Sequence, residues 1–218
     1  MTSRQLRRSL TLWQRRLTYR QRRLRAARRA NVKPRIEKWK LLVAEAERMI
    51  DRRTRQIREA RPVRERAFTI AESLVGIMEH GGNNVGPRVS ALIREAGGSP
   101  GEPWCGDFVI VCYRQAGSKL VDRSWAAVRL MMTAGVSRTS DPQRGDIVRF
   151  RFDHTGLFDC WCDHNGVRAS EQAATHLRTI EGNTGATGAV SDSTTGGDGV
   201  YRKVRERGLV SDYLRVPR

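Results

Sequence analysis

"EPWCGDFVIVC", residues 102–112, places a cysteine at the entrance of a strongly apolar run. A cysteine that only packs as a small hydrophobe belongs inside such a run. Cys105 instead follows Pro103 and Trp104, where a helix would begin. Unpaired backbone N–H groups and the positive end of the helix dipole favour the thiolate there, and the thiolate is the reactive form. Cys105 is therefore either a nucleophile or a half-buried structural cysteine, and both interpretations stay open on this segment alone.

The positive charge of the chain is concentrated near its start. The 218 residues carry 41 Lys and Arg against 23 Asp and Glu, which gives a net charge of +18. Residues 1–65 hold 22 basic and 6 acidic residues, so residues 66–218 are close to neutral. Unopposed positive charges repel one another, which favours an anionic partner for residues 1–65; the alternative is a solvated coiled-coil face.

Two amphipathic helices are expected in residues 1–65. Apolar residues recur at spacings of 3, 4 and 7 over residues 4–30 and again over residues 36–57. Asn31 and Pro34 interrupt the pattern, so we expect an antiparallel helical hairpin that ends near Pro62. No apolar stretch approaches the roughly 20 residues of a membrane span, and the start of the chain lacks the apolar core of a secretory signal. We therefore expect synthesis in the cytoplasm and no transmembrane segment.

Residues 66–218 are expected to form an α+β domain. Helical patterns cover 65–80, ending at Gly81-Gly82, then 86–98 and 103–117. Strand patterns follow, separated by a glycine-rich loop at 188–199. The expected strands cover 147–152, 155–166, 177–185, 200–206 and 213–218. Helices followed by a run of antiparallel strands are typical of the α+β class.

A thiol nucleophile needs a base, and the base needs an orienting group. His154 opens a strand after a turn at Asp153, where a ring can face a cleft; His80, His164 and His176 are more typical of surface histidines. Glu181 and Asn183 are two residues apart, so on a strand they share a face. The carboxylate there can hold an imidazole, and the amide can orient it or donate to an oxyanion; for Glu181 alone, a surface acid at a strand end is the simpler interpretation.

Metal and disulfide chemistry are not expected. The four cysteines are too few for a disulfide framework in a chain of this length. The C-x-C pair at 160–162 is shorter than the C-x-x-C spacing of zinc sites, so we predict no metal and no cofactor.

Residues 66–218 resemble the CHAP domain, a papain-like cysteine amidase/peptidase domain that cleaves peptidoglycan. The matching segments are "GNNVGPRVSALIREAGGSPGEPWCGDFV", "QRGDIVRF", "HTGLFDCW", "IEGNTG" and "GVYRKVR", in the order and spacing of the family. The resemblance implies Cys105 as nucleophile, His154 as base, Glu181 as the acid that orients it and Asn183 as an orienting or oxyanion group. It also implies that Trp104 walls the substrate groove.

Two features depart from the family pattern. Gly106 stands where the family has an alanine-like residue, and "HGGNNVGPRV" lacks the acids of the calcium loop that some members carry, so no calcium is predicted. The basic hairpin is not part of the family core. It looks like an extension that directs the enzyme to anionic envelope polymers or lipid.

The resemblance implies a bacteriophage lytic enzyme. Its partner would be bacterial peptidoglycan, and it would cut either the N-acetylmuramoyl-L-alanine amide or a peptide bond. It would be made in the host cytoplasm and reach the wall once the membrane is permeabilised. The alternatives are a virion-associated wall hydrolase used at entry and, less consistent with the Cys-His-Glu-Asn set, a nucleic-acid-binding protein that uses the hairpin. No obligatory nucleic-acid partner is expected.

Overall fold

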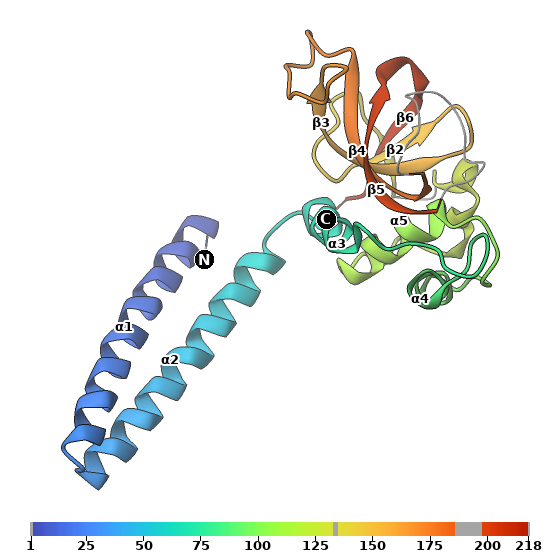
Figure 1. Ribbon diagram of the computed structural model, residues 1–218. Coiled ribbons are helices and arrows are strands. Elements are labelled where there is room, and N and C mark those ends of the chain that lie inside the picture. Colours follow the sequence, from blue (N-terminus) through green and yellow to red (C-terminus); the bar gives the residue numbers. More distant parts are fainter. Residues whose placement is uncertain (1, 133–134, 186–197, 218) are drawn as a thin grey trace. The chain divides into compact units, whose positions relative to one another are not determined.

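The chain divides into two compact units, Met1–Arg61 and Pro62–Arg218, in the computed structural model shown in Figure 1. The structure describes residues 2–132, 135–185 and 198–217. The first unit is a pair of long helices. The second combines shorter helices with a β-sheet.

The first unit consists of α1 (Ser3–Arg29) and α2 (Lys33–Glu59). Thr2 caps α1 in a capping box with Gln5, and Pro34 lies in the first turn of α2, where a missing N–H costs nothing. Asn31 adopts a left-handed backbone (φ 52°), which reverses the chain between the helices. The two helices expected from the apolar spacing are therefore confirmed.

Three helices open the second unit: α3 (Val63–Leu74), α4 (Pro87–Ala96) and α5 (Cys105–Gln115). The expected end of the first of these, at Gly81-Gly82, is wrong. After α3 the chain turns at Gly76 (φ 87°) and runs beside the strand that begins at Gly199. The Gly76 N–H donates to Val200 O, and the Val200 N–H donates to Ile77 O. Pairing with a strand distant in the sequence replaces the last helical turn.

The sheet of the second unit has six strands in the described residues, and every neighbouring pair is antiparallel. The strands are β1 (Ser137–Arg138), β2 (Ile147–Phe150), β3 (Thr155–Cys162), β4 (His176–Thr184), β5 (Gly199–Glu206) and β6 (Val210–Arg215), in the order β1-β6-β2-β3-β4-β5. Short 3₁₀ turns lie at η1 (Arg123–Ala126), η2 (Val128–Leu130) and η3 (Arg207–Leu209). The α+β class is confirmed. The short β1 was not predicted, and most of the predicted loop at 188–199 lies outside the described residues.

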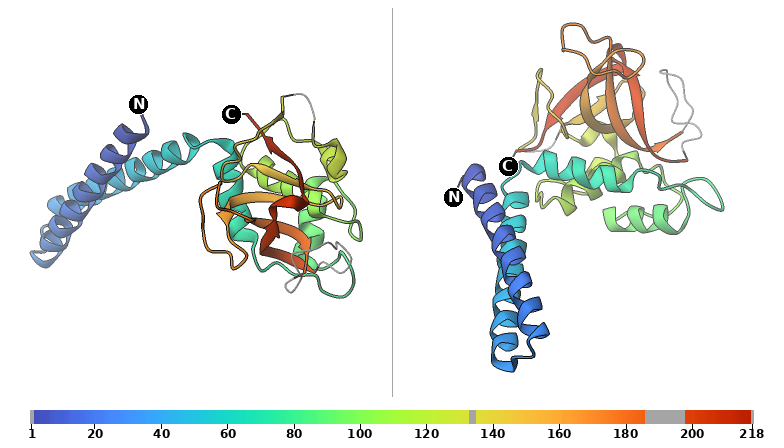
Figure 2. Two further views of the ribbon diagram at one scale, coloured as in Figure 1. Left: turned by 90° about the horizontal axis from the view of Figure 1, so that it is seen from above. Right: turned by 60° about the vertical axis from the view of Figure 1, so that its left-hand side comes forward.

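The main core lies between the helices and one face of the sheet, and α5 is its centre. The right-hand view of Figure 2 shows α3, α4 and α5 gathered on one side of the strands. Alternation along the strands divides the apolar residues between the two faces. Ile147 and Leu157 join the main core, while their neighbours Val148 and Phe158 join a second cluster. Burial on both sides makes the middle of the sheet a rigid support for side chains near α5.

Candidate active site

Cys105 is the first residue of α5 and is 6% exposed. The Phe108 N–H is the first donor within the helix and bonds to Trp104 O (2.9 Å), so the N–H groups of residues 105–107 have no acceptor within α5. A Cβ on Gly106 would lie 2.5 Å from Trp125 O, so only glycine lets η1 close over the start of α5. The close packing of η1 on the start of α5 therefore explains the glycine at position 106.

His154 lies in the turn between β2 and β3 and is 1% exposed. Asp153 has a left-handed backbone (φ 54°), and the Phe150 N–H closes the turn on His154 O at 2.9 Å. The imidazole stacks on the rings of Phe150 and Phe152, with centroids 5.9 and 5.8 Å away. The turn and the two aromatic rings together fix the plane of the imidazole.

Glu181 on β4 holds the imidazole from one side. Its Oε2 lies 3.0 Å from His154 Nε2, and the carboxylate is fully buried. A Cβ on Gly156 would come within 2.5 Å of Glu181 Cγ, so this glycine of β3 makes room for the carboxylate. A Cβ on Gly182 would come within 2.6 Å of Phe108 Cβ, so β4 approaches α5 closely next to Glu181. These two close approaches bring the carboxylate, the imidazole and the start of α5 together.

The other imidazole nitrogen is not bound by Glu181. His154 Nδ1 is buried and has no hydrogen-bond partner of standard geometry among the described residues. Hydrogen bonding and charge from Cys105 nevertheless contribute to the pKa of the ring. The thiol therefore lies close to the imidazole, whose Nδ1 is the nitrogen that Glu181 leaves without a hydrogen bond. An imidazole in that position can hold the thiol proton as an imidazolium beside the thiolate.

Burial and charge set the protonation of this pair. Burial lowers the pKa of His154, but hydrogen bonding and charge from Cys105 and Glu181 outweigh it and raise that pKa to about 9. Burial also raises the pKa of Glu181, and the combined effect of His154 and Arg205 lowers it to about 2. At neutral pH the site therefore holds an imidazolium bound to a carboxylate.

Arg205 on β5 is a member of the site that the sequence interpretation missed. The Arg205 Nη2 lies 2.6 Å from Glu181 Oε2, and the Arg205 Nε–H donates to both carboxylate oxygens (3.1 and 3.2 Å). Arg205 is 3% exposed. Thr179 Oγ1 also donates to Glu181. The only signal in the sequence is "RKVR", whose alternation puts Lys203 and Arg205 on one face of a strand without showing that the face is buried.

Replacing Arg205 by methionine is expected to destabilise the second unit by about 3–5 kcal/mol, because it leaves the buried Glu181 carboxylate without its fixed cation. Urea unfolding of the full chain measures the change. Arg202→Met is the matched control on the same strand: its partner is Glu72 at 2.8 Å, its side chain is 50% exposed, and its loss should cost about 1 kcal/mol or less. Equal costs for the two variants would contradict this role of Arg205.

The stability contributed by the His154–Glu181 pair is expected to depend on pH. The raised pKa of His154 makes its contribution complete below about 6.5 and lost as pH rises through about 9. The lowered pKa of Glu181 makes its contribution complete above about 4.5 and lost as pH falls toward about 2. Glu181→Gln should therefore cost most between about pH 4.5 and 6.5 and less at pH 9.5. Urea unfolding across this range checks it, and a cost independent of pH would contradict the pairing.

The two remaining site predictions have different outcomes in the structure. Asn183 is 5% exposed with a left-handed backbone (φ 55°), at a bulge between Glu181 and Thr184. Its side chain makes no hydrogen bond to Cys105, His154 or Glu181, all of which the structure describes. The bulge breaks the simple alternation that would put Asn183 on the face of Glu181.

Trp104, the residue before Cys105, is fully buried. Its Nε1 donates to Glu79 Oε1 at 2.9 Å, and its ring packs beneath Gly182. The resemblance assigns Trp104 to the wall of a substrate groove; in the structure its ring lies inside the protein, where it packs against β4 and supports the start of α5.

Asp107, two residues after Cys105, is also buried. Burial raises the pKa of its carboxyl to about 6, against the opposing effect of Arg123. The Arg123 guanidinium pairs with the Asp107 carboxylate, which limits the repulsion that this charge would exert on a thiolate at the same helix end.

The remaining cysteines are free and buried within the second unit, at positions 112, 160 and 162. Burial raises the pKa of Cys112 well above its ordinary value and that of Cys162 to about 11, which makes both poor nucleophiles. Over residues 2–132, 135–185 and 198–217, no three His, Cys, Asp or Glu side chains are placed to hold a metal ion. The helices in the same ranges include none with the length and apolarity of a membrane span.

Comparison of the chain with protein-family models, with curated proteins and with solved structures finds no match in any of the three.

Proposed function

We propose that this protein is a peptidoglycan hydrolase with a papain-like, CHAP-type catalytic unit, which cleaves an amide bond through Cys105. The observation that carries the proposal is the geometry at the start of α5. There His154 Nε2 is bound to Glu181 at 3.0 Å, Nδ1 has no hydrogen-bond partner in the described part of the chain, and the ring is close enough to Cys105 for the thiol to raise its pKa. A nucleophile, a base and a group that orients the base are the minimum set for covalent acyl transfer.

Acylation is the first step. In the resting site His154 already holds the proton of Cys105 as an imidazolium, and the Cys105 thiolate sulfur attacks the amide carbonyl carbon of the substrate. The resulting oxyanion is stabilised by backbone N–H groups at the first turn of α5, which have no acceptor within the helix. The C–N bond then breaks as the imidazolium gives its proton to the leaving amine, which leaves a thioester on Cys105.

Deacylation completes the cycle. Neutral His154 takes a proton from a water molecule, the hydroxide attacks the thioester carbonyl, and the thiolate leaves with the imidazole protonated again. Glu181 keeps the ring in one orientation through both steps, and Arg205 keeps Glu181 ionised. Arg205 is a positioning residue, because it contacts the carboxylate and not the reacting atoms.

The hairpin α1–α2 would bring the enzyme to the anionic surface of the envelope, as polymer or as lipid, and take no part in bond cleavage. The biological setting we propose is bacteriophage lysis: synthesis in the host cytoplasm, followed by access to the wall once the membrane is permeabilised.

Removing the hairpin is expected to separate localisation from chemistry. A chain starting at Pro62 should cleave soluble peptidoglycan fragments at a rate within about twofold of the full chain, and it should bind and lyse whole walls less well. Wall binding by the full chain should weaken steeply with salt, since exposed charges are screened over about 10 Å at 0.1 M. If the truncation lowers the melting temperature of residues 62–218 by more than about 10 °C, the hairpin stabilises the catalytic unit, and the proposal that it serves only to localise the enzyme is wrong.

Purified peptidoglycan tests the proposed reaction. Digestion by the full chain should release free amino groups and no new reducing sugar ends, because an amide and not a glycosidic bond is cut. Mass spectrometry of the fragments then shows whether the bond is the muramoyl–alanine amide or a peptide cross-link. New reducing ends without new amines would contradict the proposal.

A further inference from the structure

The two helices of the hairpin differ sharply in charge. α1 carries eleven arginines and no acidic residue. α2 carries nine Lys and Arg and five Asp and Glu, so its surface is mixed. The positive charge of the hairpin is thus mainly a property of one helix.

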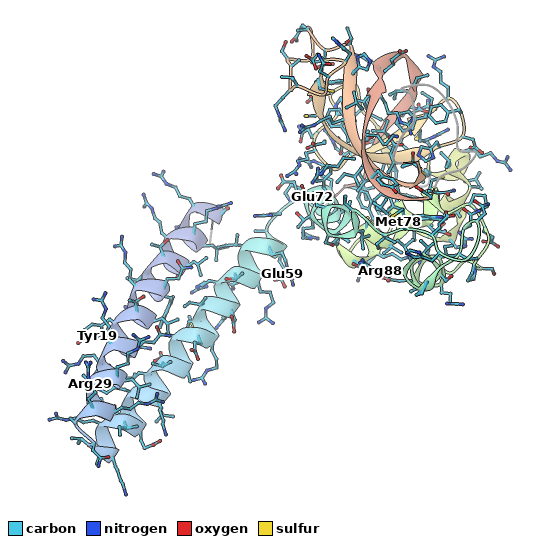
Figure 3. All side chains as sticks on the ribbon, in the orientation of Figure 1. Tyr19, Arg29, Glu59, Glu72, Met78 and Arg88 are labelled. Atoms are coloured by element: carbon cyan, nitrogen blue, oxygen red, sulfur yellow. The ribbon has the colours of Figure 1, made fainter. Side chains whose placement is uncertain are left out.

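Five of the α1 arginines form a row. Arg8, Arg15, Arg22 and Arg29 follow one another at intervals of seven residues, and Arg4 extends the series by one turn. At 100° per residue all five fall within about 60° of one another around the helix axis. A rise of 1.5 Å per residue puts successive members of the heptad series about 10.5 Å apart and spreads the row over about 38 Å. We call these five residues the arginine row; Figure 3 labels Arg29 at one end of it.

The arginine row faces away from α2. The residues of α1 that pack toward α2, such as Leu6 and Leu24, lie on the opposite side of the helix by the same 100° rotation. All five arginines of the row are exposed, and none of their side chains pairs with another described residue. In contrast, Arg20 points toward α2 and binds Glu45 at 3.1 Å. The row is therefore a set of free guanidinium groups in fixed register.

The composition around the arginine row favours a linear phosphate polymer as the occupant. A helix that binds a bilayer presents a broad apolar face, but the apolar stripe of α1 is turned toward α2. The large apolar residues that α1 exposes in the structure are Leu12 and Tyr19. Binding of single-stranded nucleic acid relies on aromatic platforms for bases, yet Tyr19 already packs edge-on against Trp39 at 6.1 Å. Guanidinium groups bind phosphate oxygens in a bidentate manner, and this requires neither apolar area nor bases.

We propose that the arginine row of α1 is the binding surface for a linear phosphodiester polymer of the cell envelope that carries no bases, and that α2 serves to hold α1 straight. The assignment of the polymer to the envelope rests on the proposed function, whereas the phosphate chemistry rests on the row alone. The polymer would lie along α1 and contact successive arginines with its phosphates.

Binding is tested on the full chain carrying Cys105→Ala, so that no hydrolysis intervenes. The probe is poly(glycerol phosphate), titrated at several salt concentrations. The row variant replaces all five arginines by glutamine, a good helix former. The matched control replaces five exposed basic residues of α2 by glutamine and changes the net charge equally: Lys38, Arg48, Arg52, Arg55 and Arg58.

The row variant should weaken binding about tenfold or more and reduce the slope of log Kobs against log salt by about 3.5, which is about 0.7 for each lost phosphate contact. The control should weaken binding by less than about threefold. Equal losses in the two variants would mean that total charge and not the row binds the polymer, which overturns the proposal. Circular dichroism checks that the helices persist. If the glutamine substitutions unfold α1, the five arginines are replaced by lysine instead. The lysine variant should bind the polymer more weakly than the original protein.

Two further probes distinguish the source of the phosphate. Single-stranded DNA of the same phosphate number and vesicles of phosphatidylglycerol should both bind more weakly than poly(glycerol phosphate), and the DNA should show no preference for base composition. Tighter binding of DNA or of vesicles that depends on the row would overturn the choice of polymer. Neither outcome affects release of amines from peptidoglycan by the unmodified chain, so a failure here is distinct from a failure of the proposed hydrolase activity.

Discussion

Cys105→Ser is expected to lower the rate of amide hydrolysis of peptidoglycan by roughly 10⁴-fold or more, because a serine hydroxyl beside His154 is much less acidic than a thiol. Nucleophile and base act together, so loss of one removes the contribution of both. The change is almost isosteric at a residue that is 6% exposed, so folding should be retained. Release of free amino groups from purified peptidoglycan measures the loss. The melting temperature should stay within about 2 °C of the original protein, since the substitution alters less than about 1 kcal/mol of stability.

Alkylation provides the control within the same chain. Iodoacetamide should modify Cys105 faster than Cys112, which lies two turns further along α5 and is fully buried. Peptide mass mapping identifies the modified thiols. Preferential labelling of Cys112, or hydrolysis that survives Cys105→Ser, would show that the nucleophile lies elsewhere.

His154→Ala is expected to reduce hydrolysis by about 10³-fold or more, since it removes the group that takes the thiol proton and then protonates the leaving amine. The double variant with Cys105→Ser should be no worse than the more damaging single variant, because residues that act as a unit do not lose activity additively. The amine-release assay measures all three proteins.

Two other histidines of the same unit are controls for His154. His164 is exposed in the turn after β3, and His176 begins β4, with ring centroids 6.5 Å apart. Neither reaches Cys105 or Glu181, so alanine at either position should leave the rate within about twofold. An essential His164 beside a dispensable His154 would contradict the site.

The order of helices and strands was predictable because it depends on local spacing. The apolar period along α1 and α2, the glycine after α4 and the alternation in β2 are all local signals. The helix start at Cys105 was predictable for the same reason, since Pro103 restricts the chain just before it. The end of α3 was not, because residues 76–79 pair with β5 across more than a hundred residues of sequence.

The candidate site was predictable in its chemistry and less so in its geometry. Cys105 begins a helix and His154 directly precedes a strand, where such residue types stand out in the sequence, and the structure brings them together with Glu181 of β4. Arg205 was missed because burial of one strand face depends on the neighbouring strands, and the bulge at Asn183 was missed because it depends on the register between β4 and β5. The burial of Trp104 could not be predicted for the same reason, since the sequence does not show whether an aromatic residue beside Cys105 lines a groove or packs inside the protein.

The pKa of His154 in the full chain, with and without the thiol, is the most direct measurement of the central claim that Cys105 and His154 form one catalytic pair. Titration of the imidazole by NMR should give a pKa of about 9 in the original protein and a clearly lower value in Cys105→Ala, because hydrogen bonding and charge from the cysteine help to raise it. The NMR signals of the exposed His164 ring, recorded at one pH, should be the same in both proteins and serve as the control. If Cys105→Ala leaves the pKa of His154 unchanged, the thiol and the imidazole do not interact, and the proposed nucleophile–base pair is contradicted.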